Sequence, residues 1–201
     1  FEEHPAQSET VPEGAPIAGT EALLLDHGVG SYLSAGSVVA EESGFYTWVW
    51  SIDRDAQGDL AQYIRDSFTD WFGRVAETHV SPFQPVAVSQ SDARLAVPGD
   101  AVSDTLTVSS SNGAWLRLDG APIPVTFTGA AYQVPGTLPP VEQAGVPADA
   151  VPLGTVEVIA TGPGVYTSPT VAFPDAGFVT WVWEMRLEAQ PEQYRDYLAD
   201  A

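Results

Sequence analysis

The stretch "GFVTWVWEM" at residues 177–185 closely repeats "GFYTWVWSI" at residues 44–52. Two tryptophans separated by a single residue are unlikely to recur by accident in a chain that has only 6 Trp. Successive side chains of a β-strand point to opposite faces. The pattern therefore places each Trp pair on one face of a strand, with Thr and Val on the other. We interpret it as a structural module that the chain uses twice.

The similarity extends to both sides of this strand. "VPEGAPIAGTEALLLDHGVGSY" (11–32) parallels "VPADAVPLGTVEVIATGPGVY" (146–166), and "QYIRDSFTD" parallels "QYRDYLAD" (193–200). A period of roughly 130 residues is too long for a solenoid and is typical of whole domains copied in tandem. We therefore expect residues 1–79 to be the C-terminal part of one repeat and residues 80–201 to be a nearly complete next repeat.

From Val80 onward, short β-like runs alternate with turn sequences such as "VPGD", "SNGA" and "TGPG". This frequency of strands and turns predicts an all-β protein built of immunoglobulin-like β-sandwiches. The Pro-rich segment 134–152 is predicted to be a long crossover loop inside the second sandwich. The predicted strands are 85–90, 93–97, 104–109, 114–118, 123–127, 155–160, 170–173 and 178–185.

One segment breaks the all-β pattern. In "DLAQYIRDSFTDWFG" (59–73), apolar residues recur at helical spacing and form one continuous stripe. Asp59 suits the N-cap and Gly73 the position after the end. We predict a short amphipathic helix over 60–72 at the repeat junction, which fixes the angle between successive domains. Its junction residues are Tyr63, Phe68, Trp71 and Phe72.

The four repeated tryptophans have two possible roles. Trp48, Trp50, Trp181 and Trp183 are predicted to be structural core, with one strand face filling the sandwich and the other packing beneath the helix. The alternative is an exposed surface on which carbohydrate rings stack. Val179 replaces Tyr46, so a platform of three rings is not repeated.

Composition excludes several classes of function. The chain has 27 acidic and 7 basic residues, a formal net charge of −20, and its basic residues are all Arg. Such a surface repels phosphate backbones and anionic membranes, so we expect no nucleic-acid partner and no membrane insertion by this segment. Without Cys, the chain has no disulfide, thiolate metal site or cysteine nucleophile.

No catalytic or cofactor-binding residues emerge, and we predict that the protein is not an enzyme. The 3 His lie in no HExxH or GxSxG motif. Asp53, Asp55 and Asp59 in "DRDAQGD" resemble the start of a calcium loop, but Ile64 stands where the twelfth-position carboxylate is expected. A solvated turn is favoured, and calcium binding is left open.

Taken together, these features resemble the tandem Ig-like repeats of cell-wall-anchored surface proteins from high-GC Gram-positive bacteria. The signatures are "AVSDTLTVSSSNGAWLRLDGAPIPVTFTGAAY" (101–132), "TGPGVYTSPTVAFPDAGFVTWVWEM" (161–185) with its earlier copy, and "FGRVAETHVSPFQPVAVSQSD" (72–92). The resemblance implies an extracellular stalk or filament that carries an adhesive or enzymatic tip. A carbohydrate- or protein-binding module with exposed Trp is the alternative.

Some stalk domains of this kind carry intramolecular covalent bonds. The Lys–Asn and cysteine-based kinds are impossible here, because neither Lys nor Cys is present. A Thr–Gln ester stays open, since Thr105, Thr107, Gln90 and Gln133 lie among the predicted strands.

The boundary near Val80 leaves the first repeat without counterparts of its early strands. A half-sandwich exposes strand edges and an apolar face. We therefore expect the chain to be a piece of a longer polypeptide. Its neighbouring repeats or subunits would complete residues 1–79 by strand complementation.

Overall fold

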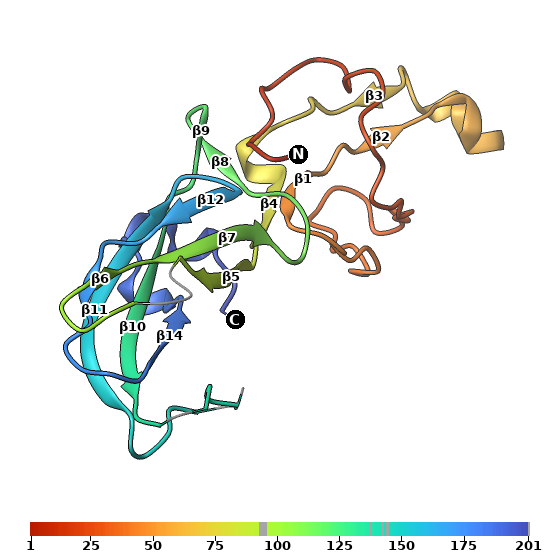
Figure 1. Cartoon of the computed structure of the whole chain (residues 1–201). Coiled ribbons are helices and arrows are strands. Elements are labelled where there is room, and N and C mark those ends of the chain that lie inside the picture. The colour runs from red at the N-terminus through yellow and green to blue at the C-terminus, as the bar shows by residue number, and fades with distance from the viewer. Residues whose placement is uncertain (93–95, 137, 142, 144, 201) are drawn as a thin grey trace.

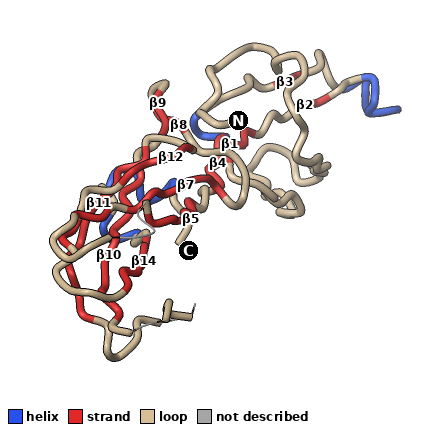
Figure 2. The backbone as a smooth tube through the Cα atoms, in the orientation of Figure 1, coloured by secondary structure: helices blue, strands red, loops and turns tan. Residues whose placement is uncertain are grey.

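The computed structural model describes residues 1–92, 96–136, 138–141, 143 and 145–200 (Figure 1). The chain is mostly β, with several small antiparallel sheets joined by loops, and the helical segments of the described part are short 3-10 helices (Figure 2). The N-terminal and C-terminal halves lie end to end, and β1 and β4 lie where they meet (Figure 1). The all-β prediction is thus correct at this coarse level.

The C-terminal half contains two three-stranded antiparallel sheets. In each sheet a long central strand, β7 or β10, separates two edge strands. The first sheet has the order β12–β7–β5, from Gly164–Thr167, Asp104–Ser110 and Pro85–Ser91. The second has the order β11–β10–β14, from Val151–Ala160, Val125–Val134 and Phe178–Glu184.

These two sheets share one hydrophobic core. Leu106 and Val108 on β7, Phe127 on β10 and Val158 on β11 belong to the same cluster of buried side chains. The burial pattern of β10 alternates strictly until its last residues, because successive side chains face the core and the outside in turn. Removing this apolar area from water is the main stabilising term for such a pair of sheets.

Smaller ladders close the ends of this half. β6 (Ala101–Val102) pairs with β13 (Val171–Ala172), and β8 (Arg117–Leu118) pairs with β9 (Ala121–Pro122). A second buried cluster of Val102, Ala131, Val171 and Phe173 lies beside the first ladder.

The N-terminal half is much less regular. β1 (Gly44–Thr47) pairs with β4 (Thr78–Ser81), and β2 (Ser51–Ile52) pairs with β3 (Phe68–Thr69). Residues 1–43 form no strand and contribute only isolated bridges, at Ser8 and Ser43. β4 spans the expected repeat boundary at 79/80.

Most of the predicted strands are present. β5, β7, β10, β11, β13 and β14 overlap the predicted runs, whereas 114–118 shortens to β8. The run 93–97 includes residues 93–95, which lie outside the described residues. The Pro-rich segment is not a crossover: β10 and β11 pair with each other, so it is the connection of a long hairpin.

The helix predicted over 60–72 is wrong. A 3-10 helix, η1 (Asp55–Tyr63), is broken at Gly58 (φ 57°), and Ile64 is extended. Leu60, Tyr63 and Phe68 are exposed, so most of the apolar stripe that would stabilise a helix is uncovered, and burial is confined to its end at Phe72. The chain instead turns back and pairs Phe68 with Ile52. The remaining 3-10 helices are η2 (Val75–Glu77), η3 (Leu187–Ala189) and η4 (Glu192–Tyr197).

Candidate functional site

The repeated tryptophans form the same stacked pair in both halves. The Trp181 and Trp183 rings are 5.8 Å apart with an interplanar angle of 14°, and the Trp48 and Trp50 rings are 5.7 Å apart with an angle of 11°. Each pair lies on one face of its strand, as the alternation of the sequence predicts. The surroundings of the two pairs differ.

Trp183 is fixed in the C-terminal half by two contacts. Its ring covers Gly129 on the paired strand β10, where a Cβ atom would lie only 2.5 Å from the ring. Its indole N–H donates a 2.7 Å hydrogen bond to Oδ2 of Asp104 on β7. Trp183 therefore connects the two sheets across the core.

Asp104 is fully buried and accepts from several donors. Its Oδ1 accepts the backbone N–H of Thr105 at 3.1 Å. Its own N–H donates to Ser168 Oγ at 2.9 Å, and its carbonyl accepts the N–H of Ser168 at 2.8 Å. The bonds from Trp183 and Thr105 replace the water that the buried carboxylate loses, and the bonds with Ser168 satisfy the backbone.

Trp181 packs against the second buried cluster, next to Ala131 and Val171. Its indole N–H is buried and has no hydrogen-bond partner among the described residues. Trp48 and Trp50 are partly buried, as Trp181 and Trp183 are, but they belong to neither core cluster. Of the four tryptophans predicted to be structural core, Trp181 and Trp183 pack on the buried clusters, whereas Trp48 and Trp50 do not.

Two further contacts recur in both halves. The Tyr166 hydroxyl donates to the carbonyl of Gly162 (2.9 Å) and accepts the N–H of Thr161. The Tyr32 hydroxyl donates to the carbonyl of Gly28 (2.6 Å) and accepts the N–H of His27. These glycines appeared in the sequence only as turn residues; the recurring Gly-x-Gly-x-Tyr spacing is the signal that could have revealed the contact.

The predicted junction residues do not act together. Phe72 is buried and packs edge-on against Phe1, with centroids 5.6 Å apart. Tyr63, Phe68 and Trp71 are exposed. The halves are instead joined through Phe45, which is 3% exposed and lies in the core of the C-terminal half.

The acidic loop shows no arrangement for calcium. Asp53 Oδ1 accepts the N–H of Asp55 at 3.0 Å, and the backbone carbonyl of Asp59 accepts the Gln62 side-chain amide. Asp59 lies inside η1 and does not cap it. Across the described ranges, no group of three or more His, Cys, Asp or Glu side chains is placed to hold a metal ion.

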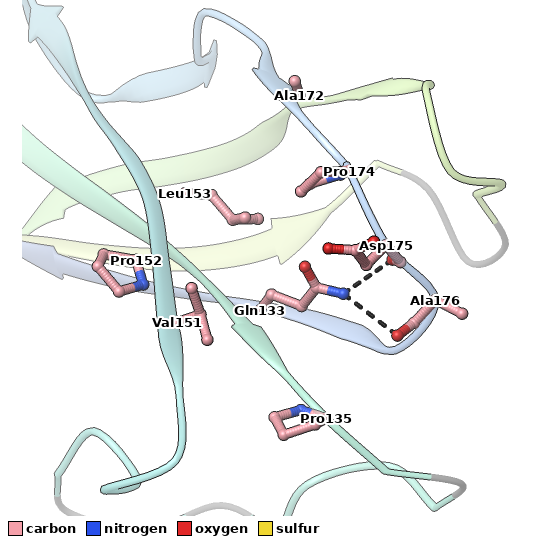
Figure 3. Close-up of a pocket in the computed structure, with 9 residues that line it drawn as sticks. All are labelled: Gln133, Pro135, Val151, Pro152, Leu153, Ala172, Pro174, Asp175 and Ala176. Atoms are coloured by element: carbon pink, nitrogen blue, oxygen red, sulfur yellow. Dashed lines mark hydrogen bonds between the residues drawn. The ribbon is translucent and has the colours of Figure 1, made fainter.

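Two of the groups considered for a Thr–Gln ester, Thr105 and Gln133, have other partners. The Thr105 hydroxyl donates to Asp92, and Gln90 lies across the ladder from Thr105 with its side chain exposed. The Gln133 amide donates to the carbonyls of Asp175 and Ala176 at 2.8 and 3.2 Å (Figure 3). No contact between a Thr hydroxyl and a Gln side chain that would precede an ester is present among these residues.

Among the described residues, Asp92 has a shifted pKa. Hydrogen bonds from the hydroxyls of Ser103 and Thr105 to its carboxylate lower the pKa of Asp92 below its ordinary value. The stability that these bonds add is present above that ordinary pKa and is lost as the pH falls through the lowered one. Because the carboxylate is exposed, solvent screens this contribution.

A hollow of about 440 Å³ lies where β10 and β11 approach the 172–176 segment (Figure 3). Its only ionisable side chain is Asp175, and it pairs no nucleophile with a base. It is lined by Gln133, Pro135, Val151, Pro152, Leu153, Ala172, Pro174, Asp175 and Ala176.

No protein-family profile matches the chain, and no curated protein or solved structure is significantly similar to it. Within the described residues, no helix has the length and apolar character needed to cross a membrane.

Proposed function

We propose that this chain is a non-enzymatic structural repeat of a bacterial cell-surface protein, built of tandem Ig-like sandwiches that form an extended stalk or filament. The observation that carries the proposal is the use of the repeated Trp motif in the C-terminal half. There Trp183 covers Gly129 and donates to the buried Asp104. A residue placed in this way holds two sheets together, which is a structural role.

The joint between the halves supports a head-to-tail array. Phe45 at the start of β1 packs with Phe83 and Leu198 in the core of the next repeat. Phe178 occupies the same position in the second copy of the motif and is half-buried. A further repeat would contact Phe178 as the C-terminal half contacts Phe45. The partners are then neighbouring repeats or subunits, together with whatever surface the tip binds.

The charge and residue usage fit an extracellular, cell-wall-anchored location. A net charge of −20 keeps neighbouring stalks apart and soluble. The hollow beside β10 and β11 holds no nucleophile–base pair, the described residues hold no metal cluster, and the proposal needs neither.

Solution scattering of a lengthened chain tests this function. Asp200 matches Asp70 in the repeat, so residues 71–200 appended after Asp200 add one period. We expect the maximum dimension to grow in proportion to the number of repeats. A radius of gyration that rises by only about 1.2-fold, as for a compact particle, would contradict a stalk.

A second function is favoured by one observation. The Trp48 and Trp50 rings are stacked and partly exposed and, unlike Trp181 and Trp183, pack on neither buried cluster, which leaves them able to stack on a sugar ring. If the chain is a carbohydrate-binding module, cell-wall polysaccharide should change its tryptophan fluorescence. The double variant W48A/W50A should abolish that change, whereas F68A, at another exposed aromatic, should keep it.

A further inference from the structure

The two copies of the repeated strand differ along one edge. In the second copy, the N–H of Thr126 on β10 donates to Gln190 Oε1, and Gln190 Nε2 donates back to the Thr126 carbonyl, both at 2.8 Å. The N–H and C=O groups of Thr126 therefore point toward the β14 side of β10. Because backbone direction alternates along a strand, Thr180 and Val182 of β14 direct theirs toward β10.

In the first copy, β3 and β4 occupy the opposite edge. The N–H of Trp48 donates to the Glu77 carbonyl at 2.9 Å, and the Trp50 carbonyl accepts the N–H of Asp70 at 2.8 Å. Because backbone direction alternates along the strand, the N–H and C=O groups of Thr47 and Val49 point away from β3 and β4. These two residues are the counterparts of Thr180 and Val182. No residue in the described ranges pairs with them on that side.

The register of this open edge is set by Phe1. The N–H of Phe45 donates to the Phe1 carbonyl at 2.8 Å, and the Phe1 ammonium donates to the Phe45 carbonyl. In the second copy the corresponding residue, Phe178, pairs with Val134 at the end of β10. Phe1 therefore stands where the last residue of a β10-like strand would stand.

Two side chains around this edge lack contacts that their counterparts in the second copy make. Gln190 is buried against Thr126, whereas its counterpart Gln57 is exposed. Each of these amides still donates to the carbonyl four residues before it. The Trp50 indole N–H has no acceptor among the described residues, whereas Trp183 has Asp104.

The segments that would pair with such a strand are not strands themselves. Residues 17–26 match β11 and residues 30–33 match β12, and both are irregular. Leu24 is 77% exposed and Leu33 91%. Both halves nevertheless keep one close approach, Gly19 to Val38 and Gly154 to Val171. The irregular segments thus keep one native-like contact but lack the strands that would order them.

We propose that the Thr47–Val49 edge and the Trp48–Trp50 face form a docking site for an antiparallel segment of the type of residues 80–133. Its β10-like strand would place a glycine opposite Trp50, and its β7-like strand would supply a carboxylate for the Trp50 indole N–H. This proposal rests on the repeat architecture proposed above. The partner is thereby defined: a strand pair whose pattern is that of β7 and β10.

A fusion tests the proposal directly. Residues 80–133 are placed immediately before Phe1, so that Phe1 takes the position of Val134 and the register is preserved. Hydrogen exchange, followed residue by residue by NMR, is compared with that of the unfused chain. We expect exchange at the Thr47 and Val49 amides and at the Trp50 indole to slow by 100-fold or more.

Two matched controls keep the result specific. In one, Gly129→Leu is made in the added segment only, so that a side chain meets the Trp50 ring. In the other, a single residue is inserted before Phe1, which moves every side chain of the added strand to the wrong face. Both should return exchange at Thr47 and Val49 to the rate of the unfused chain.

Three outcomes would overturn the proposal. They are unchanged exchange in the fusion, equal protection in the controls, and protection of Thr47 in the unfused chain by self-association detected in light scattering. The last would make a second copy of the chain the occupant. The scattering of the lengthened chain tests the proposed function separately. If the maximum dimension grows with each repeat but exchange in the fusion is unchanged, this docking site is refuted and the proposed function is not.

Discussion

At the scale of the residue, the two Trp pairs form an internal comparison. In Trp183→Phe the ring is largely kept, but the donor to the buried Asp104 is lost. We expect the free energy of unfolding to fall by about 1–3 kcal/mol, because the carboxylate loses a hydrogen bond inside the core. Urea unfolding measures it. Trp50→Phe is the matched control and should change stability by less than about 0.5 kcal/mol.

Gly129 is needed for close packing and not for turn geometry. Because its added Cβ would lie 2.5 Å from the Trp183 ring, Gly129→Ala forces the ring or β10 to move. We expect a loss of about 1–3 kcal/mol from overpacking, with a changed near-UV circular dichroism of the Trp pair. Gly154→Ala, where the nearest atom is 3.6 Å away, should be tolerated. Equal losses in the two variants would show that the ring does not constrain Gly129.

At the scale of the element, Gln190 continues the β10–β14 ladder after β14 has ended. Its side chain gives Thr126 the two bonds that another strand residue would give. Gln190→Ala should therefore lower the free energy of unfolding by about 1–3 kcal/mol and speed exchange of the Thr126 amide. The control is Gln57→Ala, since Gln57 is exposed. If both substitutions are neutral, the Gln190 bridge does not stabilise the sheet.

The strands were predictable because their signal is local. β7 alternates inward and outward residues, β14 carries the repeated alternation of Trp with Val, and turn sequences separate both from their neighbours, so pattern alone located them. The helix over 60–72 has an equally clear pattern but is absent, because most of its apolar stripe, from Leu60 to Trp71, has no surface to pack on. Periodicity describes which face could be buried; tertiary contacts decide whether it is.

The contacts of the candidate site could be predicted only in part. The alternation around Trp181 and Trp183 correctly grouped the rings on one face. The acceptor Asp104, the glycine beneath Trp183 and the bridging Gln190 come from three other segments. Their pairing depends on how the sheets face each other, which single-sequence spacing does not encode. Comparison of the two copies of the repeat shows which of these contacts each copy keeps.

At the scale of the whole molecule, the two halves share core residues across their joint. Phe45 lies in the C-terminal core with Phe83, and its ring is 6.1 Å from that of Tyr197. The Ser43 N–H also donates to the carbonyl of Asn112 at 2.8 Å, and its hydroxyl donates to that of Ala114 at 2.7 Å. The halves are therefore joined by residues just before β1 and at its start, together with Glu2, whose carbonyl accepts the N–H of Arg117 at 2.8 Å, and not by the predicted junction helix.

This assignment predicts that Phe45→Ala acts on both halves at once. The substitution empties a site in the core of residues 83–198, so we expect that half to lose about 3–5 kcal/mol although Phe45 lies outside it in sequence. The orientation of the two halves should also broaden, and scattering should report a larger spread of dimensions. Phe68→Ala is the control: Phe68 is 54% exposed and belonged to the predicted junction helix. If Phe68→Ala loosens the halves and Phe45→Ala leaves them fixed, the joint lies at β3 and the shared core does not set the angle of the stalk.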